Sequence, residues 1–151
     1  MAVKTLLLDE AEFIDFQLYG LVSAYTDSAQ LVYHINRSFE TQFSRTTDLD
    51  VVIEKQITYF PVFEWENAQT GAYYYIIKNA SYNLDSQKDS PNLSALFDVA
   101  PVLIQSYKQY NFLLKVSGDV SDGLPISENS FISILTELET DGIKTINRLI
   151  F

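Results

Sequence analysis

The chain has 151 residues, of which 47% are apolar and 20% charged, which fits one globular domain spanning residues 1–151. It contains no Cys, and this excludes thiol nucleophiles and thiolate metal ligands. Twenty acidic side chains against ten basic ones give a net charge of -10, which argues against nucleic acid and anionic membranes as partners.

Two strands are predicted before residue 26. Residues 3–8 form the weaker one, and the acidic residues 9–12 form a turn after it. The second begins at Ile14, where apolar and polar side chains alternate. Its apolar side chains are Ile14, Phe16, Leu18 and Val22. Because its other face is polar, we expect this strand to be half-buried.

After Thr26 the spacing of apolar residues changes to about four, which is typical of an amphipathic helix. The apolar positions are Leu31, Val32, Ile35, Phe39 and Phe43. Asp27 or Ser28 precedes them and can cap the free amides of the first turn.

Three more strands are predicted after this helix. Leu49, Val51 and Ile53 alternate with polar residues in the first of them. Residues 58–66 and 72–79 form a hairpin joined by residues 67–71. Pro61 has no amide donor, so we expect a bulge or a sheet edge there.

The last third of the chain starts with a loop over residues 80–92, and residues 107–116 form a further strand. A second amphipathic helix is predicted before Gly142 from side chains that share one helical face. These are Phe131, Ile134, Leu135 and Leu138. The apolar residues 143–151 should dock on the domain as a strand or turn.

Together these elements predict an α+β fold: a mainly antiparallel sheet of five to six strands, one long helix in the N-terminal half and a second, C-terminal helix. Acidic residues from Asp9 onward interrupt the apolar start of the chain, so we expect no secretory signal. No apolar run approaches the roughly 20 residues of a membrane helix. We therefore expect a cytoplasmic protein.

Several stretches of the sequence resemble the bacterial IPExxxVDY family. They are residues 15–21, 31–37, 48–49, 73–79 and 103–114. Along residues 104–112 the family's naming motif is matched by Ile104, while Gln105, Ser106, Tyr110, Asn111 and Phe112 stand in for its other residues. The family has no assigned activity, so the resemblance implies no catalytic residues. Neither Ser106 nor Asn111 titrates near neutral pH, which favours a packing and turn motif over an active site.

The residues offer little reactive chemistry. His34 is the single histidine and lies at the margin of the helical apolar stripe, where a packed or surface role is the simpler interpretation. The five glycines are isolated, so no phosphate-binding loop can be drawn. Four acids in two i, i+2 pairs could bind a hard cation or share a proton, although solvated strand ends explain them more simply. They are Asp48, Asp50, Glu64 and Glu66. We assign no catalytic, cofactor-binding or metal-binding residue.

Aromatic residues are concentrated in the predicted hairpin. Consecutive tyrosines at 73–75 place an aromatic ring on each face of one strand, so one face either lies under a helix or is exposed. An exposed face would suit a partner protein. The interface candidates are Phe63, Trp65, Tyr73, Tyr74 and Tyr75.

By elimination, the sequence favours a non-enzymatic protein-interaction module that binds a partner protein or a second copy of itself, as a homodimer. The alternative is a small-molecule-binding protein or a carboxylate-dependent hydrolase, in which the four acids would surround a pocket. Convergence of those acids in one concave site would favour the alternative.

Overall fold

The computed structural model describes residues 15–80, 101–118, 120 and 123–151. The strand predicted over residues 3–8, the turn over 9–12 and nearly all of the loop over 80–92 lie outside the described residues.

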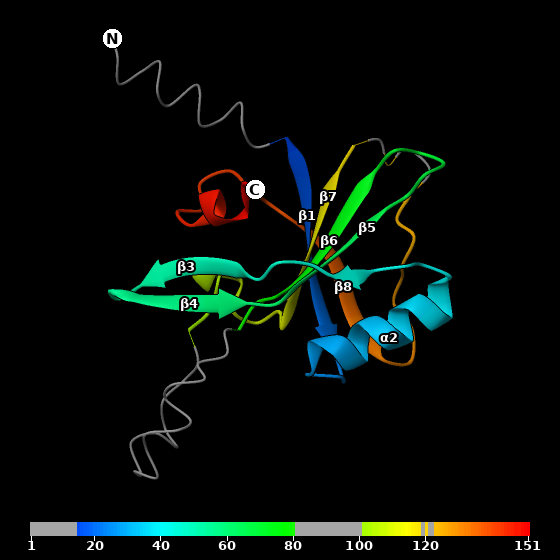
Figure 1. Ribbon diagram of the computed structural model, residues 1–151, viewed down its shortest axis with the longest axis horizontal. Helices are drawn as coiled ribbons and strands as arrows, with labels where there is room; N and C mark the ends of the chain where they lie inside the picture. Colours follow the sequence, from blue (N-terminus) through cyan, green and yellow to red (C-terminus); the bar gives the residue numbers. More distant parts are fainter. Residues whose placement is uncertain (1–14, 81–100, 119, 121–122) are drawn as a thin grey trace.

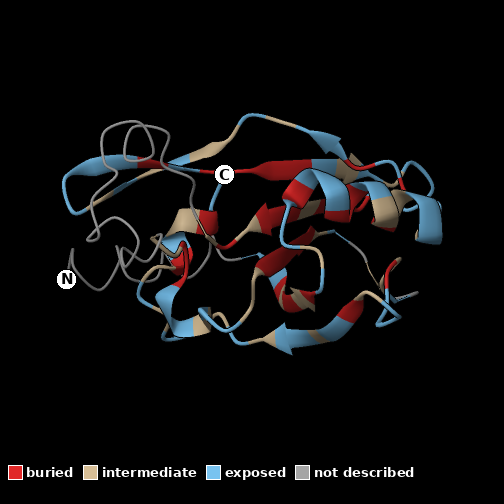
Figure 2. Cartoon of the chain, turned by 90° about the horizontal axis from the view of Figure 1, so that it is seen from below, coloured by how far each residue is buried: buried red, intermediate tan, exposed pale blue. Residues whose placement is uncertain are grey.

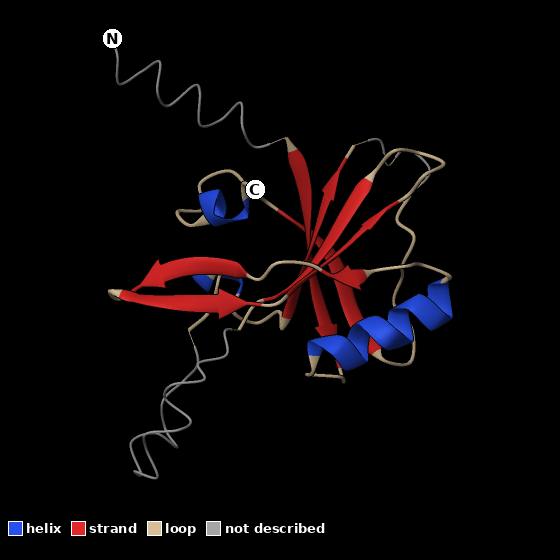
Figure 3. Cartoon of the chain, viewed as in Figure 1, coloured by secondary structure: helices blue, strands red, loops and turns tan. Residues whose placement is uncertain are grey.

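The centre of the fold is a six-stranded antiparallel sheet with the strand order β2-β5-β6-β7-β1-β8 (Figures 1 and 3). Its strands are β1 (Phe16–Ser23), β2 (Ser44–Arg45), β5 (Val62–Glu66), β6 (Tyr73–Lys78), β7 (Phe112–Ser117) and β8 (Ile132–Leu138). Strands β3 (Leu49–Ile53) and β4 (Gln56–Phe60) pair separately as a hairpin. One α-helix, α2 (Ser28–Phe39), and two 3-10 turns, η1 (Gln105–Tyr107) and η2 (Ile146–Leu149), complete the described elements. The predicted α+β class and antiparallel sheet are confirmed.

Helix α2 begins where the sequence predicted. The side chain of Asp27 accepts a hydrogen bond of 2.9 Å from the amide of Gln30, which satisfies one of the free first-turn donors. Glu40 ends the helix with a φ of 57°. Phe43, the last residue of the predicted stripe, follows the helix but is still buried beneath it.

The two faces of the sheet carry two separate cores. On the helix face, residues of β1, β5, β6 and β7 pack against Leu31, Val32 and Ile35 of α2. On the opposite face, which we call the hairpin face, the sheet packs against the hairpin and the C-terminal segment. Figure 2 shows the buried residues along the strands and exposed ones along the outer side of α2. The predicted alternation of β1 is present at its start, where Phe16 and Leu18 are buried and Gln17 is exposed. The second half of β1 is buried on both faces, as Leu21 shows.

The second helix predicted around residues 131–138 is wrong, because this segment is strand β8, which pairs with β1. It lies at the edge of the sheet, where Ile132 is buried but Ile134 is 41% exposed. An edge strand with exposed apolar residues does not show the expected alternation, so its apolar spacing imitates a helix. The β-branched residues at 132, 134 and 136 are the signal that favours a strand.

The predicted hairpin over residues 58–79 is confirmed for β5 and β6 but not for its first residues. Pro61 divides the segment: residues before it belong to β4 and pair with β3, and residues after it belong to β5. A residue without an amide donor suits this position, where the chain passes from one sheet to the other. The predicted docking of the C-terminal residues is also confirmed, since Ile146 and Leu149 are buried.

The turn of the β3–β4 hairpin is strained. Its central residues, Glu54 and Lys55, have φ angles of 52° and 68°, a region in which glycine and asparagine are favoured. Replacing them together with Asn-Gly should stabilise the protein by about 1 kcal/mol, measured as a higher urea midpoint. As a control, Gln109→Gly changes an exposed residue whose φ is not positive and should lower the midpoint. An unchanged midpoint in the Asn-Gly variant would show that the turn is not strained.

Candidate functional site

A lysine lies buried on the hairpin face of the sheet. Lys115 is in β7, directly between Tyr75 of β6 and Leu18 of β1, and its relative exposure is 4%. Residues paired across neighbouring strands share a face, so its side chain projects on the same side as that of Tyr75. A lysine this deeply buried is rare unless it is paired with an acid.

The amine of Lys115 is surrounded by aromatic rings. Its Nζ lies 3.8 Å from the ring centroid of Phe151, 5.0 Å from that of Phe16 and 5.2 Å from that of Tyr75. We call these three rings the aromatic cage. The Nζ also donates a hydrogen bond of 3.3 Å to the main-chain oxygen of Phe151. Among the described residues, no Asp or Glu carboxylate forms an ion pair with it. Cation–π contacts and one hydrogen bond to a main-chain oxygen are therefore the contacts that hold this amine.

This environment makes the amine less basic. Burial lowers the pKa of Lys115 to about 8, because the charged form loses its hydration, while the negative charge of Asp15 acts in the opposite direction. A substantial fraction of the side chain is therefore neutral just above physiological pH. Neutral lysine is a nucleophile, whereas the ammonium form is not.

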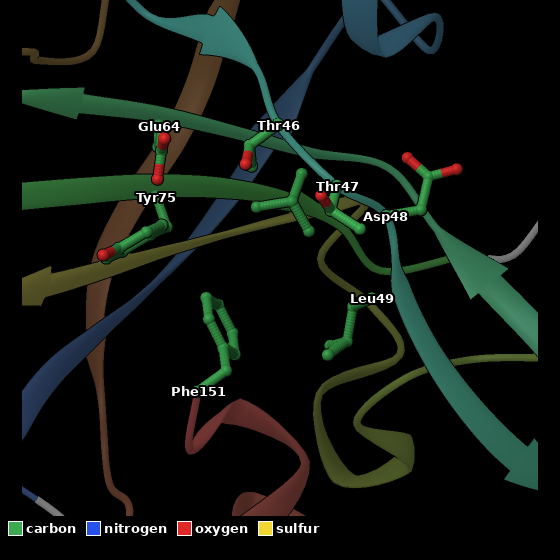
Figure 4. Close-up of a pocket in the computed structure, with 8 residues that line it drawn as sticks. Thr46, Thr47, Asp48, Leu49, Glu64, Tyr75 and Phe151 are labelled. Atoms are coloured by element: carbon green, nitrogen blue, oxygen red, sulfur yellow. The ribbon is translucent and has the colours of Figure 1, made fainter.

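A cavity of about 300 Å³ adjoins the cage. It lies where the connection from β2 to β3 passes over strands β5 and β6 (Figure 4). Its walls are formed by Thr46, Thr47, Asp48, Leu49, Val62, Glu64, Tyr75 and Phe151. Tyr75 and Phe151 belong both to the cavity wall and to the cage, so the two features are neighbours. The cavity is at the lower end of the size range for small-molecule sites.

Only two of the four predicted acids meet at this cavity. Asp48 and Glu64 line it, whereas Asp50 and Glu66 do not. Oδ1 of Asp48 forms an ion pair with Nη2 of Arg45 at a distance of 2.6 Å. In Figure 4 the carboxylate of Asp48 points away from the cavity. The described residues contain no group of three or more His, Cys, Asp or Glu side chains that could hold a metal ion. The acids therefore do not converge as paired-acid catalysis requires.

The five aromatic interface candidates do not form one exposed surface. Because side chains alternate along a strand, they divide between the faces of the sheet. Phe63 and Tyr74 are buried beneath helix α2, and Trp65 is half-buried beside them. Tyr75 is half-buried in the cage, and only Tyr73 is exposed, at 43%. One of the two alternatives for the tyrosine triplet was that a helix covers one face of the strand. This is the case for Tyr74, which packs in the core beneath α2.

His34 is packed among aromatic rings. Its ring stacks on that of Tyr25, with centroids 4.3 Å apart and an angle of 1° between the planes. Phe131 and Tyr33 lie within 6 Å on other sides. These ring contacts match the packing role that the sequence favoured for His34.

The segment that carries the family resemblance makes turns and core contacts. Ile104 and Phe112 are fully buried. The Nδ2 of Asn111 donates to the main-chain oxygen of Ser23 at 3.0 Å, and its Oδ1 accepts from the amide of Ser23 at 3.1 Å. The side-chain amide of Asn79, which is buried and directly follows β6, binds the same segment. These are the contacts of a packing and turn motif.

Sequence reasoning missed an exposed apolar patch on the hairpin. Val52, Ile57 and Tyr59 are 67%, 59% and 44% exposed. Val52 pairs directly with Ile57, and Tyr59 is two residues further along β4, so all three lie on one face of the hairpin. We call these three residues the hairpin patch. A usable signal was present in the sequence, because apolar side chains in β3 and β4 occur on both faces of the hairpin and only one face can pack on the sheet.

Comparisons of the chain with protein-family models, curated proteins and solved structures found no match. The resemblance to the IPExxxVDY family therefore stays a prediction. Helix α2 has 12 residues, and no helix within the described ranges is both long and apolar enough to span a membrane.

Proposed function

We propose that this chain is a non-enzymatic protein-interaction module that binds a basic, apolar segment of another protein through the hairpin patch. The observation that carries this proposal is the cluster of Val52, Ile57 and Tyr59, three large apolar side chains exposed side by side. Exposed apolar side chains are ordinary when scattered, but a contiguous group on one element is typical of binding surfaces. In Figure 1 the turn of this hairpin reaches beyond the main sheet.

The surrounding charges favour a basic partner. Asp50 pairs directly with Tyr59, and Glu54 lies in the hairpin turn, while Lys55 is the one base of the hairpin. The whole chain carries a net charge of -10, so two copies repel each other and a positively charged partner is attracted. This favours a different protein with Lys or Arg beside apolar anchors over a second copy of this chain.

The β8 edge of the main sheet is a poorer candidate. Strand addition there would need the outward amides of β8. However, the amide of Leu135 already donates to Oε2 of Glu128 at 3.0 Å. An edge amide already bound by a side chain disfavours pairing with a partner strand, which leaves the hairpin patch as the better surface.

The test is a selection of peptides from a random library displayed on phage, with the purified protein as bait. We expect enriched peptides that combine apolar anchors with Lys or Arg. Ile57→Glu should weaken binding of a selected peptide at least about tenfold, because a charge replaces a central apolar contact. Tyr33→Glu is the matched control, since Tyr33 is 58% exposed but lies on α2, and it should leave binding unchanged.

Two outcomes would contradict the proposal. Peptides that bind wild type and Ile57→Glu equally would place the binding surface elsewhere. A wild-type dimer by light scattering that Ile57→Glu dissociates would show that the patch serves self-association instead.

A small-molecule-binding protein is the second candidate function, and the cavity beside the aromatic cage is the observation that favours it. The carboxylate-dependent hydrolase is less well supported. Asp48 is paired with Arg45, which leaves Glu64 as the one cavity acid outside that ion pair.

A further inference from the structure

We propose that Lys115 is a carbonyl-reactive amine, which forms an imine with small aldehydes that enter the cavity beside Tyr75 and Phe151. This inference goes beyond the interaction surface and does not depend on it, because the hairpin patch and the cavity share no residue. It rests on the position of the amine, on its protonation and on access from the cavity.

Lys115 occupies a position where an ammonium group is costly to bury, although its contacts with the cage and with Phe151 offset part of that cost. The hairpin face around it is apolar, with Leu18 paired directly to it and Leu113 two residues away on the same strand. A Met or Leu there would avoid the cost of burying an ammonium group. The cage restricts the amine to one place, which is what a positioned nucleophile requires.

The protonation of Lys115 favours nucleophilic attack. With a pKa of about 8, about a quarter of the amine is neutral at pH 7.5, against about one part in a thousand for an ordinary lysine. The titratable groups that face this amine are Asp15 before β1, Tyr75 on β6 and Glu64, which lies beyond Tyr75 in the same row on β5. Burial also raises the pKa of Tyr75, so this phenol stays neutral while Lys115 titrates.

Access to the amine requires one side chain to move. Phe151 covers the Nζ at 3.8 Å and also lines the cavity, yet the residue is 53% exposed. An exposed aromatic side chain changes rotamer quickly. When the ring of Phe151 turns aside, a molecule in the cavity faces the amine directly.

The reaction balances without an oxidant or reductant. The lone pair of neutral Nζ forms a bond to the aldehyde carbon, and the π electrons of the carbonyl move to its oxygen, which takes up a proton. The nitrogen then loses one proton to solvent, which gives a carbinolamine. Its hydroxyl takes up a second proton from solvent and leaves as water while the nitrogen lone pair forms the C=N bond, and the resulting iminium returns a proton to solvent. The sum is one amine and one aldehyde giving one imine and one water.

The test uses benzaldehyde, whose flat apolar ring suits the aromatic walls, with cyanoborohydride to trap the imine as a stable benzylamine. Peptide mass mapping then gives a labelling rate for each lysine. We expect Lys115 to react at least about tenfold faster at pH 7.5 than the exposed Lys55, Lys108 and Lys144. Its rate should rise through pH 8 and level off above about pH 9, where the amine is almost entirely neutral. A rate equal to or below that of the exposed lysines would overturn the proposal.

Two further arms test the route. Thr47→Trp places a large ring at the exposed rim of the cavity and should slow Lys115 labelling at least about fivefold, whereas Thr47→Ala should not. Unchanged labelling in Thr47→Trp would overturn entry through the cavity. Faster labelling in urea below the unfolding transition would show that the amine reacts only through local opening, which would overturn the proposal as well.

Discussion

Replacing Asn79 with alanine should lower the free energy of unfolding by about 3–5 kcal/mol, the largest effect that we expect from a single polar side chain here. Asn79 is 1% exposed at the end of β6. Its Nδ2 donates to the main-chain oxygens of Tyr107 and Tyr110 at 2.9 and 3.0 Å. Its Oδ1 accepts from the amide of Ile104 at 3.0 Å.

The size of this effect follows from what the substitution leaves behind. Alanine removes three hydrogen bonds at once. The oxygen of Tyr107 still accepts from the amide of Tyr110 at 3.0 Å. The oxygen of Tyr110 and the amide of Ile104, however, lose their Asn79 partner. Each buried polar group without a partner costs about 1–3 kcal/mol. The three groups belong to one connected turn, so the costs are not simply additive. Urea unfolding measures the change. Asn67→Ala is the control, because its side chain accepts one bond in an exposed turn, and it should cost less than about 1 kcal/mol.

Asn79→Asp separates the role of the amide from that of packing. The carboxylate keeps the shape of the amide but cannot donate, so it faces two carbonyl oxygens with no hydrogen between them. We expect a loss similar to that of alanine at pH 7, with part of the stability regained at low pH, where the acid can donate once. If either variant lost less than about 1 kcal/mol, Asn79 would not organise residues 101–111.

Local signals in the sequence predicted much of this fold. The cap at Asp27, the alternation in β3 and the turn before Gly71 act between near neighbours, and the structure contains each of them. The helix predicted around residues 131–138 was wrong because this segment pairs only with β1 at the edge of the sheet. Which of its side chains are buried depends on that distant strand and not on the local spacing of apolar residues.

The candidate site was harder to predict, although one signal was present. Residues 112–116 read Phe-Leu-Leu-Lys-Val. A strand with apolar side chains at both odd and even positions is typically buried on both faces. A lysine inside such a run is therefore buried, which the sequence alone could have shown. Its cage could not be predicted, because Phe16 and Phe151 lie far from it in the chain. The division of the aromatic candidates between two cores likewise depends on a helix covering one face.

Gly20 and Tyr110 form the second contact where we expect a large effect. A Cβ atom built on Gly20 would lie 2.6 Å from Cγ and Cδ1 of the Tyr110 ring, closer than carbon atoms approach. Gly20→Ala should therefore destabilise the protein by about 2–3 kcal/mol, the range for overfilling a packed site. Without this ring, alanine in a strand would be more stable than glycine by about 0.5–1 kcal/mol, so the sign of the change is itself informative.

A double-mutant cycle assigns the effect to this contact. Tyr110→Ala removes the ring and leaves space above β1, so Gly20→Ala should cost little in that background and could become stabilising. We expect a coupling energy of at least about 1 kcal/mol from urea unfolding. Additive costs would mean that another neighbour restricts Gly20.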